Sequence, residues 1–308
     1  MAARYRIEHD TRYVHASAVS TSQHVAYLRP RELPRQRVHA HELAIDPHPV
    51  VASDRVDYFG NVADQFTVLQ PYAELSVRSR SLVEVLPGER AVEPESSPPW
   101  ESVRGALAYG QGTFPGESAQ YAYASPYVMP DPELADFARG CFPPGRPLLA
   151  GAVDLTHRIH AEFRFDPRAT TITTPVRRVL AERRGVCQDF AHLQISCLRS
   201  LGLAARYVSG YLLTDPQPGQ LRLAGADASH AWISVPCPRH GWVDLDPTND
   251  VMPDLRHVTL AWGRDYGDVS PLRGVILGGA RHTLHVGVSV TPLDAGEWEN
   301  ALRPATGA

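Results

Sequence analysis

The sequence has no long hydrophobic run and little cysteine. No stretch of its 308 residues approaches the roughly 20 consecutive apolar residues that a membrane-spanning helix needs. The first residues, MAARYRIEHDTRY, are charged and alternate in polarity, so they lack the apolar segment of a secretory signal. Four cysteines in a chain of this length are too few for a disulfide scaffold. We therefore expect a cytoplasmic protein with reduced thiols and no membrane partner.

A strong excess of one charge is also missing. The 30 Lys and Arg residues against 34 Asp and Glu residues give a net charge of −4, and no basic run forms a nucleic-acid patch. We therefore expect no nucleic-acid partner. A hydrophobic content of 43% and a charged content of 21% are typical of a soluble globular protein. The length suits two domains or one large one.

The first 86 residues are rich in short β-forming runs that Pro, Gly, Asn and Asp separate. This pattern predicts a β-rich amino-terminal domain over residues 1–86, built as a small antiparallel sandwich. Residues 87–99 contain four prolines and paired serines. We interpret residues 87–135 as a Pro-rich linker or extension before the next domain.

From about residue 131 the apolar residues recur near a period of 3.6, which indicates helices. Gly185 is placed to end one of them, and the next begins near Cys187 with an apolar face. Strands are predicted at residues 205–213, 229–235, 242–246 and 283–290. The fold class is therefore α+β, with a second domain over residues 136–293 in which a helix packs on an antiparallel sheet. Residues 294–308 read as a poorly ordered tail.

Cys187 is the first candidate for chemistry because of its position at a helix start. The partial positive charge and the unpaired N–H groups there favour the thiolate, which is the attacking form of cysteine. A small buried hydrophobe is the alternative role for any free cysteine. Cys197 lies ten residues further along the apolar face, so we assign it to the core.

A hairpin supplies two further candidates, His230 and Asp246. Two β-forming runs flank residues 236–240, which suggests a five-residue loop. Pairing Val235 with Gly241 then places His230 opposite Asp246, on one face of the sheet. This register prefers Asp246 over Asp244 as the partner of the imidazole. A core histidine and a simple turn aspartate are the alternatives for these two residues.

Together the three side chains make a complete nucleophilic set. Cys187 provides a soft nucleophile, His230 accepts its proton, and Asp246 holds the tautomer and orientation of the ring. The backbone N–H of Cys187 is a natural donor to an oxyanion. The sequence does not identify a second oxyanion donor.

These residues resemble the transglutaminase-like, papain-related superfamily. Gly-x-Cys at residues 185–187, His-Ala-Trp at 230–232 and Asp-Pro-Thr at 246–248 follow the order of its pattern. The segments YRIEH at 5–9, LRPR at 28–31 and DYFGN at 57–61 are similar to the β-rich region that precedes this core in bacterial members, and VGVSVTPL at 286–293 resembles their final strand. The resemblance implies a papain-like core and the catalytic roles already assigned to the three residues.

The resemblance also sets the range of activities. It implies thiolate attack on a peptide or protein amide, with a thioester that water or an amine then resolves. We favour hydrolysis, with cross-linking of glutamine to amines and a non-catalytic peptide-binding module as alternatives. No EF-hand-type calcium loop is present, and we expect no cofactor and no metal. The sequence does not fix the oligomeric state.

Several other residues near these motifs have weaker signals. Asp189 is expected to cap the first turn of the Cys187 helix, and His192 to be exposed or to serve in packing. Trp232 and Trp242 are expected either to wall the cleft or to pack in the core. Cys237 and His240 have a Cys-x₂-His spacing, but a structural zinc site usually needs four such ligands and no second close pair exists.

Overall fold

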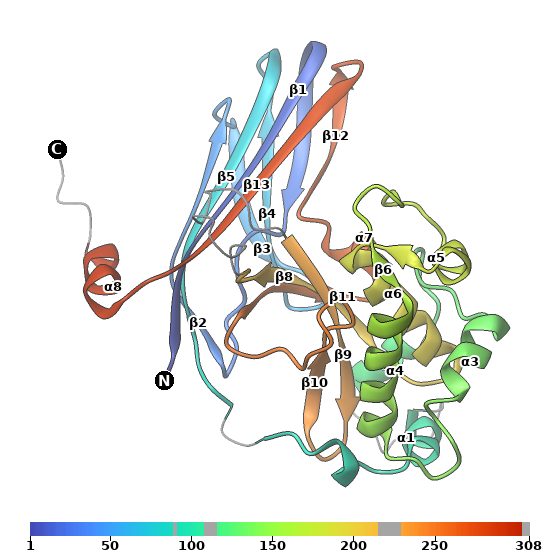
Figure 1. Ribbon diagram of the computed structural model, residues 1–308. Helices are drawn as coiled ribbons and strands as arrows, with labels where there is room; N and C mark the ends of the chain where they lie inside the picture. The colour runs from blue at the N-terminus through green and yellow to red at the C-terminus, as the bar shows by residue number, and fades with distance from the viewer. Residues whose placement is uncertain (89–90, 108–115, 215–228, 304–308) are drawn as a thin grey trace.

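The chain folds into a large antiparallel sheet, a smaller antiparallel sheet and a group of helices beside the smaller sheet (Figure 1). The computed structural model describes residues 1–88, 91–107, 116–214 and 229–303. The large sheet consists of β1 (Ala3–Ala26), β2 (Gln36–Asp46), β3 (Val51–Val56), β4 (Val62–Val68), β5 (Tyr72–Val85), β12 (Leu272–Gly278) and β13 (His282–Pro292). The smaller sheet consists of β8 (Arg206–Leu212), β9 (Ser229–Cys237), β10 (Gly241–Leu245) and β11 (His257–Gly263). Two further short strands, β6 (Arg164–Phe165) and β7 (Arg184–Gly185), form a separate parallel pair.

The helical segments follow the amino-terminal sheet and interleave with the smaller one. They are the short turns η1 (Pro94–Ser96) and η2 (Gln120–Ala122), and the helices α1 (Trp100–Leu107), α2 (Gly116–Ala119), α3 (Pro132–Arg139), α4 (Leu148–Glu162), α5 (Val176–Glu182), α6 (Cys187–Ser200), α7 (Tyr266–Val269) and α8 (Ala295–Leu302). Among the described residues, none of these helices has the length and apolar character that a membrane span requires.

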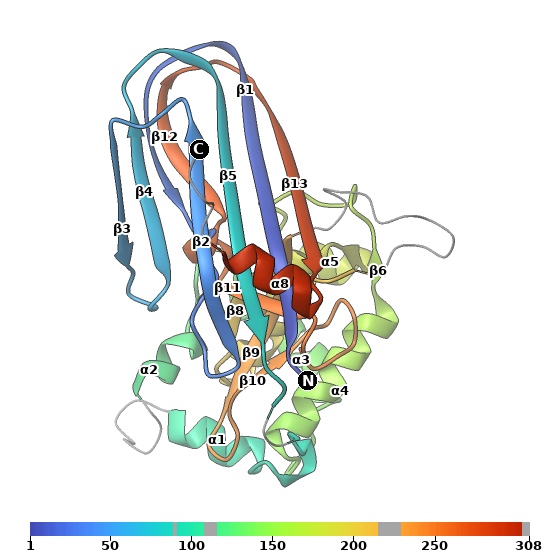
Figure 2. The ribbon, with the colours of Figure 1, turned by 90° about the vertical axis from the view of Figure 1, so that its left-hand side faces the viewer.

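The large sheet is organised around β1, which is shared between two halves of the sheet. The first half of β1 pairs with β5 and β13, while its second half pairs with β4 and β12. An irregularity between Val14 and Val19 separates the two halves. Side chains from both halves enclose a separate hydrophobic cluster that includes Phe66, Leu75 and Leu272. The result is the expected sandwich-like arrangement, and its long strands project away from the helices (Figure 2).

The last strands of the chain do not join the smaller sheet. The strand predicted at residues 283–290 lies within β13, which pairs with β1 from Tyr5↔Pro292 to His15↔His282. β12, which the sequence did not indicate, pairs with the second half of β1. The division of the chain at residues 86, 135 and 293 stays a prediction. What the structure adds is that the carboxy-terminal strands complete the amino-terminal sheet.

The predicted poorly ordered tail is wrong for residues 295–302, which form α8. Asp294 and Glu297 make a reciprocal capping box at its start. Trp298 is buried against His39, with ring centroids 5.0 Å apart, and Arg4 stacks on the same indole. One anchoring aromatic and a good cap therefore order a short polar segment. Residues 304–308 lie outside the described residues.

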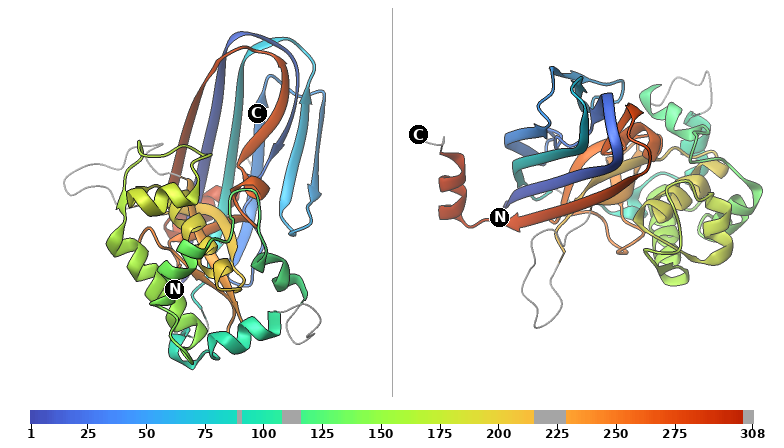
Figure 3. Two further views of the ribbon diagram at one scale, coloured as in Figure 1. Left: turned by 90° about the vertical axis from the view of Figure 1, so that its right-hand side faces the viewer. Right: turned by 90° about the horizontal axis from the view of Figure 1, so that it is seen from above.

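The strands of the smaller sheet lie in the order β10-β9-β8-β11, and β9 contains the candidate residue His230. Helix α6 packs against β9 and is itself covered by α3, α4 and α5 (Figure 3). The apolar face predicted for α6 is confirmed, since Phe190, Leu193, Cys197 and Leu198 are all buried. The α+β class, with a Cys-bearing helix on an antiparallel sheet, is thus confirmed. Strand β11 was not predicted.

Two amide side chains from the amino-terminal region close the free edge of β11. Gln36 pairs with the backbone N–H and carbonyl of Thr259, both at 2.8 Å. Asn61, from the DYFGN segment, pairs in the same way with Trp262, both at 2.9 Å. Each amide replaces the donor and acceptor of a neighbouring strand, which removes the exposed edge. The two sheets are therefore joined at β11.

A stack of cations and indoles reinforces this junction. The guanidinium of Arg31 lies 3.5 Å from the ring centroid of Trp262, and that of Arg206 lies 3.7 Å from it. Arg206 also lies 4.0 Å from the ring of Trp242. Cation–π contacts of this kind contribute roughly 0.5–2 kcal/mol each, depending on how far they are desolvated. They fix the amino-terminal sheet against the sheet that carries the site.

Close packing at β9 depends on a glycine of β8. Gly210 pairs with His230, and a Cβ on this glycine would overlap the Val258 carbonyl oxygen and the ring of Trp232. Trp232 is fully buried. Only glycine therefore lets β8, β11 and the indole of β9 approach one another.

We expect Gly210→Ala to lower the unfolding free energy by about 2–3 kcal/mol, because the added methyl overpacks a closed site. Urea unfolding of wild type and variant measures the difference. Gly105→Ala is the matched control, because a Cβ there meets nothing within 4 Å and the residue lies in helix α1. A Gly210→Ala protein as stable as the Gly105→Ala protein would contradict this packing.

Candidate active site

Cys187 is the first residue of α6, as the sequence predicted. Its side chain is half-buried, and its thiol is free of any disulfide. Its backbone N–H donates to no residue among those the structure describes. The start of a helix stabilises negative charge through its dipole and such free donors. A thiolate at this position, or an oxyanion next to it, is therefore favoured.

Asp189 braces the turn that presents Cys187. Its carboxylate accepts hydrogen bonds from the Val186 N–H at 2.8 Å and the Thr170 hydroxyl at 2.6 Å. This confirms the predicted capping of the first turn. The prediction that Gly185 ends the preceding helix is wrong, because α5 ends at Glu182 and Gly185 belongs to β7. A Cβ at Gly185 would lie 2.8 Å from the Asp189 carboxylate, so the glycine makes room for this bond.

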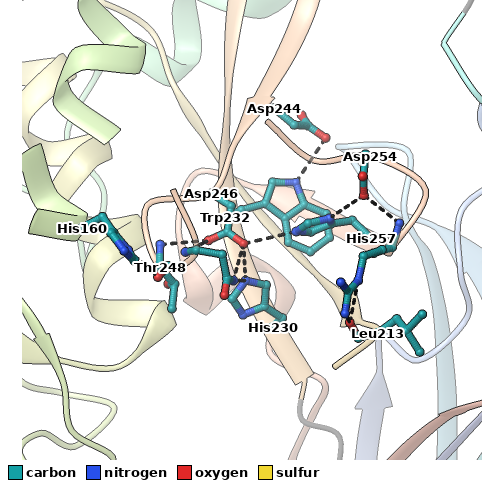
Figure 4. A network of polar contacts seen from close by, with 11 residues as sticks. His160, Leu213, His230, Trp232, Asp244, Asp246, Thr248, Asp254 and His257 are labelled. Atoms are coloured by element: carbon teal, nitrogen blue, oxygen red, sulfur yellow. Dashed lines mark hydrogen bonds and ion pairs between the residues drawn. The ribbon is translucent and has the colours of Figure 1, made fainter. Parts of the chain in front are cut away.

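His230 and Asp246 are brought together on one face of the smaller sheet. His230 Nε2 lies 2.7 Å from Asp246 Oδ2, and both side chains are nearly or fully buried (Figure 4). The Cys187 side chain lies within hydrogen-bonding reach of the same imidazole. Because Nε2 faces the carboxylate, Nδ1 is the ring nitrogen left for the sulfur. The three predicted residues therefore form a continuous row.

The predicted hairpin register was wrong by two residues, although the predicted contact is present. Cys237 pairs with Gly241, and Ile233 with Leu245, so the loop has three residues instead of five. A shift of two residues keeps every side chain on its original face. Asp246 follows the end of β10 and reaches His230 diagonally, a distance that long side chains bridge.

The Asp246 carboxylate is held by more groups than the sequence indicated. Its Oδ1 accepts from the backbone N–H groups of Thr248 at 2.9 Å and Asn249 at 3.3 Å. The Asn249 side-chain amide donates to Oδ2 at 2.7 Å and lies 3.2 Å from His230 Nε2. Asn249 directly follows the Asp-Pro-Thr motif, so its position in the sequence could have indicated a contact with Asp246.

His257 is a second residue that sequence reasoning missed. It begins β11, and its Nε2 lies 3.2 Å from Asp246 Oδ2. Its ring is buried against Trp232 in a T-shaped contact, with centroids 5.3 Å apart. Figure 4 shows the two imidazoles approaching the carboxylate from different sides. Nothing in the sequence marked this histidine, because β11 itself was not recognised.

The electrostatics of the row favour a charged imidazole. Burial on its own lowers the pKa of His230, but the hydrogen bonds with Asp246 and Cys187 outweigh it and raise that pKa to about 10. Burial would raise the pKa of Asp246, but the hydrogen bonds from His230 and His257 hold it well below its usual range. The carboxylate and the imidazolium therefore stabilise each other.

The other candidates fall into structural roles. His192 is buried rather than exposed: it stacks on Tyr127 at 5.6 Å and accepts from the Tyr266 N–H at 3.1 Å. Cys197 is fully buried, as predicted, and burial raises the pKa of its thiol. Trp232 packs in the interior and donates to Asp244.

Cys237 and His240 have different surroundings. Cys237 is buried, while His240 Nε2 lies 2.9 Å from the Ser96 hydroxyl. Trp242 is partly exposed and lines two cavities of about 520 and 800 Å³, so it is a wall residue as well as part of the cation–π stack.

One group of described residues has ligand atoms close enough to hold a metal ion, and it is His230, Asp246 and His257. Their atoms lie within 4.8 Å of one another. The donor types suit Zn²⁺, but the 2.7 Å separation of His230 Nε2 and Asp246 Oδ2 is that of a direct hydrogen bond. The Asn249 amide also points its N–H at the same oxygen. The set fits a hydrogen-bond network better than a coordination sphere.

Comparison with known families matches both parts of the chain. The family model described as the bacterial transglutaminase-like N-terminal region matches residues 5–84, and the model of the transglutaminase-like superfamily matches residues 136–247. The second match contains Cys187, His230 and Asp246.

Two mycobacterial relatives match nearly the whole chain, and one further relative matches part of it. An uncharacterized protein of Mycobacterium tuberculosis is 41% identical over 302 residues, which cover 94% of this chain and 93% of that protein. One from Mycobacterium leprae is 32% identical, covering 94% of this chain and 99% of its own length. A protein-glutamine gamma-glutamyltransferase of Pseudomonas aeruginosa is 28% identical over 129 residues, which cover 36% of this chain and 19% of that protein.

A solved structure supports the fold over nearly the whole chain. The crystal structure of a provisionally named cysteine protease from Cytophaga hutchinsonii aligns with a TM-score of 0.73 and 19% sequence identity. The alignment covers 96% of this chain and 92% of the other. At this identity the likeness concerns the fold, in which both the amino-terminal sheet and the core are shared.

We expect Asp246→Asn to lower the unfolding free energy by about 3 kcal/mol near pH 5, because it leaves half of a buried ion pair unpaired. The pKa of His230 is raised from 6.5 to about 10, so its contribution is complete below pH 6.5 and is lost as the pH rises through about 10. The pKa of Asp246 is lowered from 3.8, so its contribution is complete above pH 3.8 and is lost on acidification.

The cost of Asp246→Asn should therefore be largest between these two ordinary values and shrink toward pH 10. Urea unfolding at pH 5, 7 and 9.5 measures this trend. Asp254→Asn serves as the control, since the Asp254 side chain is 65% exposed and should cost little at any pH. A cost for Asp246→Asn that stays constant from pH 5 to 9.5 would rule out the ion pair.

Proposed function

Because the chain belongs to the transglutaminase-like superfamily, we propose that it is a cysteine-dependent amide hydrolase or acyltransferase acting on peptide or protein amides. The observation that carries the proposal is the row of Cys187, His230 and Asp246. A half-buried thiol at a helix start meets an imidazole that a buried carboxylate holds at 2.7 Å. A structural histidine would not need its ring fixed beside a thiol in this way.

The reaction begins with the Cys187 thiolate and the His230 imidazolium. The sulfur attacks the amide carbon and forms a C–S bond, and the carbonyl oxygen becomes an oxyanion next to the Cys187 N–H. The imidazolium gives its proton to the amide nitrogen as the C–N bond breaks, which releases an amine or ammonia and leaves a thioester. His230 then takes a proton from water, which attacks the thioester and restores the thiolate.

Asp246 has two roles in this sequence of steps. Its carboxylate fixes the ring so that one nitrogen faces the sulfur, and it stabilises the positive charge on the ring in the steps where the ring is protonated. The backbone amides of Thr248 and Asn249 keep the carboxylate itself from turning. Preorganisation of this kind avoids reorganisation during the reaction and is usually a large contribution to catalysis.

Amine transfer is the second candidate activity, and it shares the thioester. The named activity of the Pseudomonas relative favours it, because the part that aligns with this chain is 28% identical. The two activities differ only in whether water or an amine resolves the thioester. We prefer hydrolysis because the sequence has no calcium loop of the kind described above.

We expect wild-type protein to cleave or deamidate members of a peptide library, and Cys187→Ala to lose at least about 10⁴-fold of that activity, as for removal of a triad nucleophile. Mass spectrometry of the products identifies the reaction. Addition of water, together with either cleavage of the peptide or release of ammonia, means hydrolysis. A labelled primary amine in a parallel reaction detects transfer. Equal turnover by wild type and Cys187→Ala would remove Cys187 from the mechanism.

The matched control is Cys197→Ala, which deletes a thiol from the same helix but from its buried face. This variant should lose some stability and keep its specific activity below the unfolding temperature. No turnover or amine incorporation by wild type over the whole library would favour a peptide-binding module that retains the fold.

A further inference from the structure

We propose that His257 is a positioning residue that holds Asp246 from a different side than His230, an inference that rests on the proposed function. The two imidazoles meet the same carboxylate oxygen, with His230 Nε2 at 2.7 Å and His257 Nε2 at 3.2 Å from Asp246 Oδ2. The row of interacting groups therefore extends from three residues to four.

The direction of the hydrogen bond follows from the charge of Asp246. An ionised carboxylate only accepts, so His257 donates through an Nε2–H. Its Nδ1 is buried without a hydrogen-bond partner among the described residues, and it lies 3.8 Å from Asp254 Oδ1. In its neutral form His257 is therefore the Nε2–H tautomer. A tautomer with the proton on Nδ1 would put two acceptors face to face at Asp246.

The surroundings of His257 make it a better anchor than the segment that carries Asp246. Asp246 lies just past the end of β10, whereas His257 pairs with Leu212 within the smaller sheet. The edge of β11 is fixed by Gln36 and Asn61 through the amide pairs described above. His257 thus ties the carboxylate to a strand that is hydrogen-bonded on both sides.

The charged groups around His257 come from three directions. Asp246 faces Nε2, the exposed Asp254 faces Nδ1, and the ring centroid of His230 lies 6.1 Å away. The indole of Trp232 covers the ring edge-on, and its own N–H is directed to Asp244 instead. Of the charged groups that the structure describes, Asp246 alone is close enough to form a direct hydrogen bond with this imidazole.

Loss of the donor has a specific consequence for the thiol. Oδ2 would keep the bonds from His230 and Asn249 but lose its tie to β11, so the carboxylate is held less tightly from that side. An imidazolium with a poorly held partner is less stable, and the thiolate that depends on it becomes less populated at acidic pH. Cys187 should then react more slowly with an electrophile at acidic pH.

Two substitutions separate a hydrogen-bonding role from simple filling of space. His257→Gln places an amide N–H near the position of Nε2. His257→Phe keeps a ring against Trp232 but has no donor. The measurement is the pH profile of the rate at which iodoacetamide alkylates Cys187, located by peptide mass spectrometry, with thermal unfolding recorded for each variant.

We expect His257→Phe to lower the alkylation rate at pH 6 about tenfold or more, which is the effect that one hydrogen bond to a charged group supplies. The loss of rate should be largest at acidic pH. His257→Gln should stay within about threefold of wild type and keep the wild-type profile. Asp254→Asn is the control beside Nδ1, and it should leave the profile unchanged.

A wild-type profile in His257→Phe would overturn the proposal, as would equal impairment of the Gln and Phe variants. Failure of the proposed function is distinguishable, because wild-type Cys187 would then show no fast alkylation at pH 6. Should His257→Phe not fold, ¹⁵N NMR of wild type decides the matter. A neutral His257 with its proton on Nε2 supports the proposal, and a proton on Nδ1 contradicts it.

Discussion

The candidate site depends on one buried carboxylate, that of Asp246. It is fully buried and carries a charge, a state that is costly unless every lone pair is satisfied. Five donors satisfy it: two backbone N–H groups, one side-chain amide and two imidazoles. Since this charge cannot be removed or turned without large cost, the His230 ring next to it is fixed. The Cys187 thiol, which forms a hydrogen bond with the same ring, then meets an imidazole that is held in place.

The rest of the fold can be understood as the support of this arrangement. Helix α6 presents the thiol, β9 presents the imidazole, and the turn after β10 presents the carboxylate. The amino-terminal sheet contributes from a distance, because Gln36 and Asn61 replace the missing neighbour of β11. That sheet is in turn completed by β12 and β13 from the far end of the chain. The two parts that match separate family models are therefore joined through β11, which pairs with β8 on one side and meets the amino-terminal side chains on the other.

Local patterns in the sequence predicted what is encoded locally. The helix start at Cys187, the apolar face of α6 and the motifs around His230 and Asp246 were all readable from periodicity and residue type. The register of the hairpin was not, because a two-residue shift preserves the alternation of faces on which the prediction rested. The contact was still correct, since a diagonal neighbour on the same face also reaches.

Contacts between distant segments were the part that could not be predicted. His257 lies in a strand whose edge is closed by side chains more than 200 residues away, and no periodic pattern records such pairing. The helix α8 was missed for a similar reason, because Trp298 is ordered by contacts with Arg4 and His39 at the other end of the chain. Asn249, by contrast, directly follows the Asp-Pro-Thr motif and was within reach of sequence reasoning.

The most direct test of this account is the titration of His230 by ¹⁵N NMR, with the signal assigned by comparison with His230→Gln. The hydrogen bonds with Asp246 and Cys187 raise the pKa of His230 to about 10, so the ring should remain an imidazolium through pH 8. A His230 signal that titrates with a midpoint near the ordinary value of about 6.5 would contradict the account.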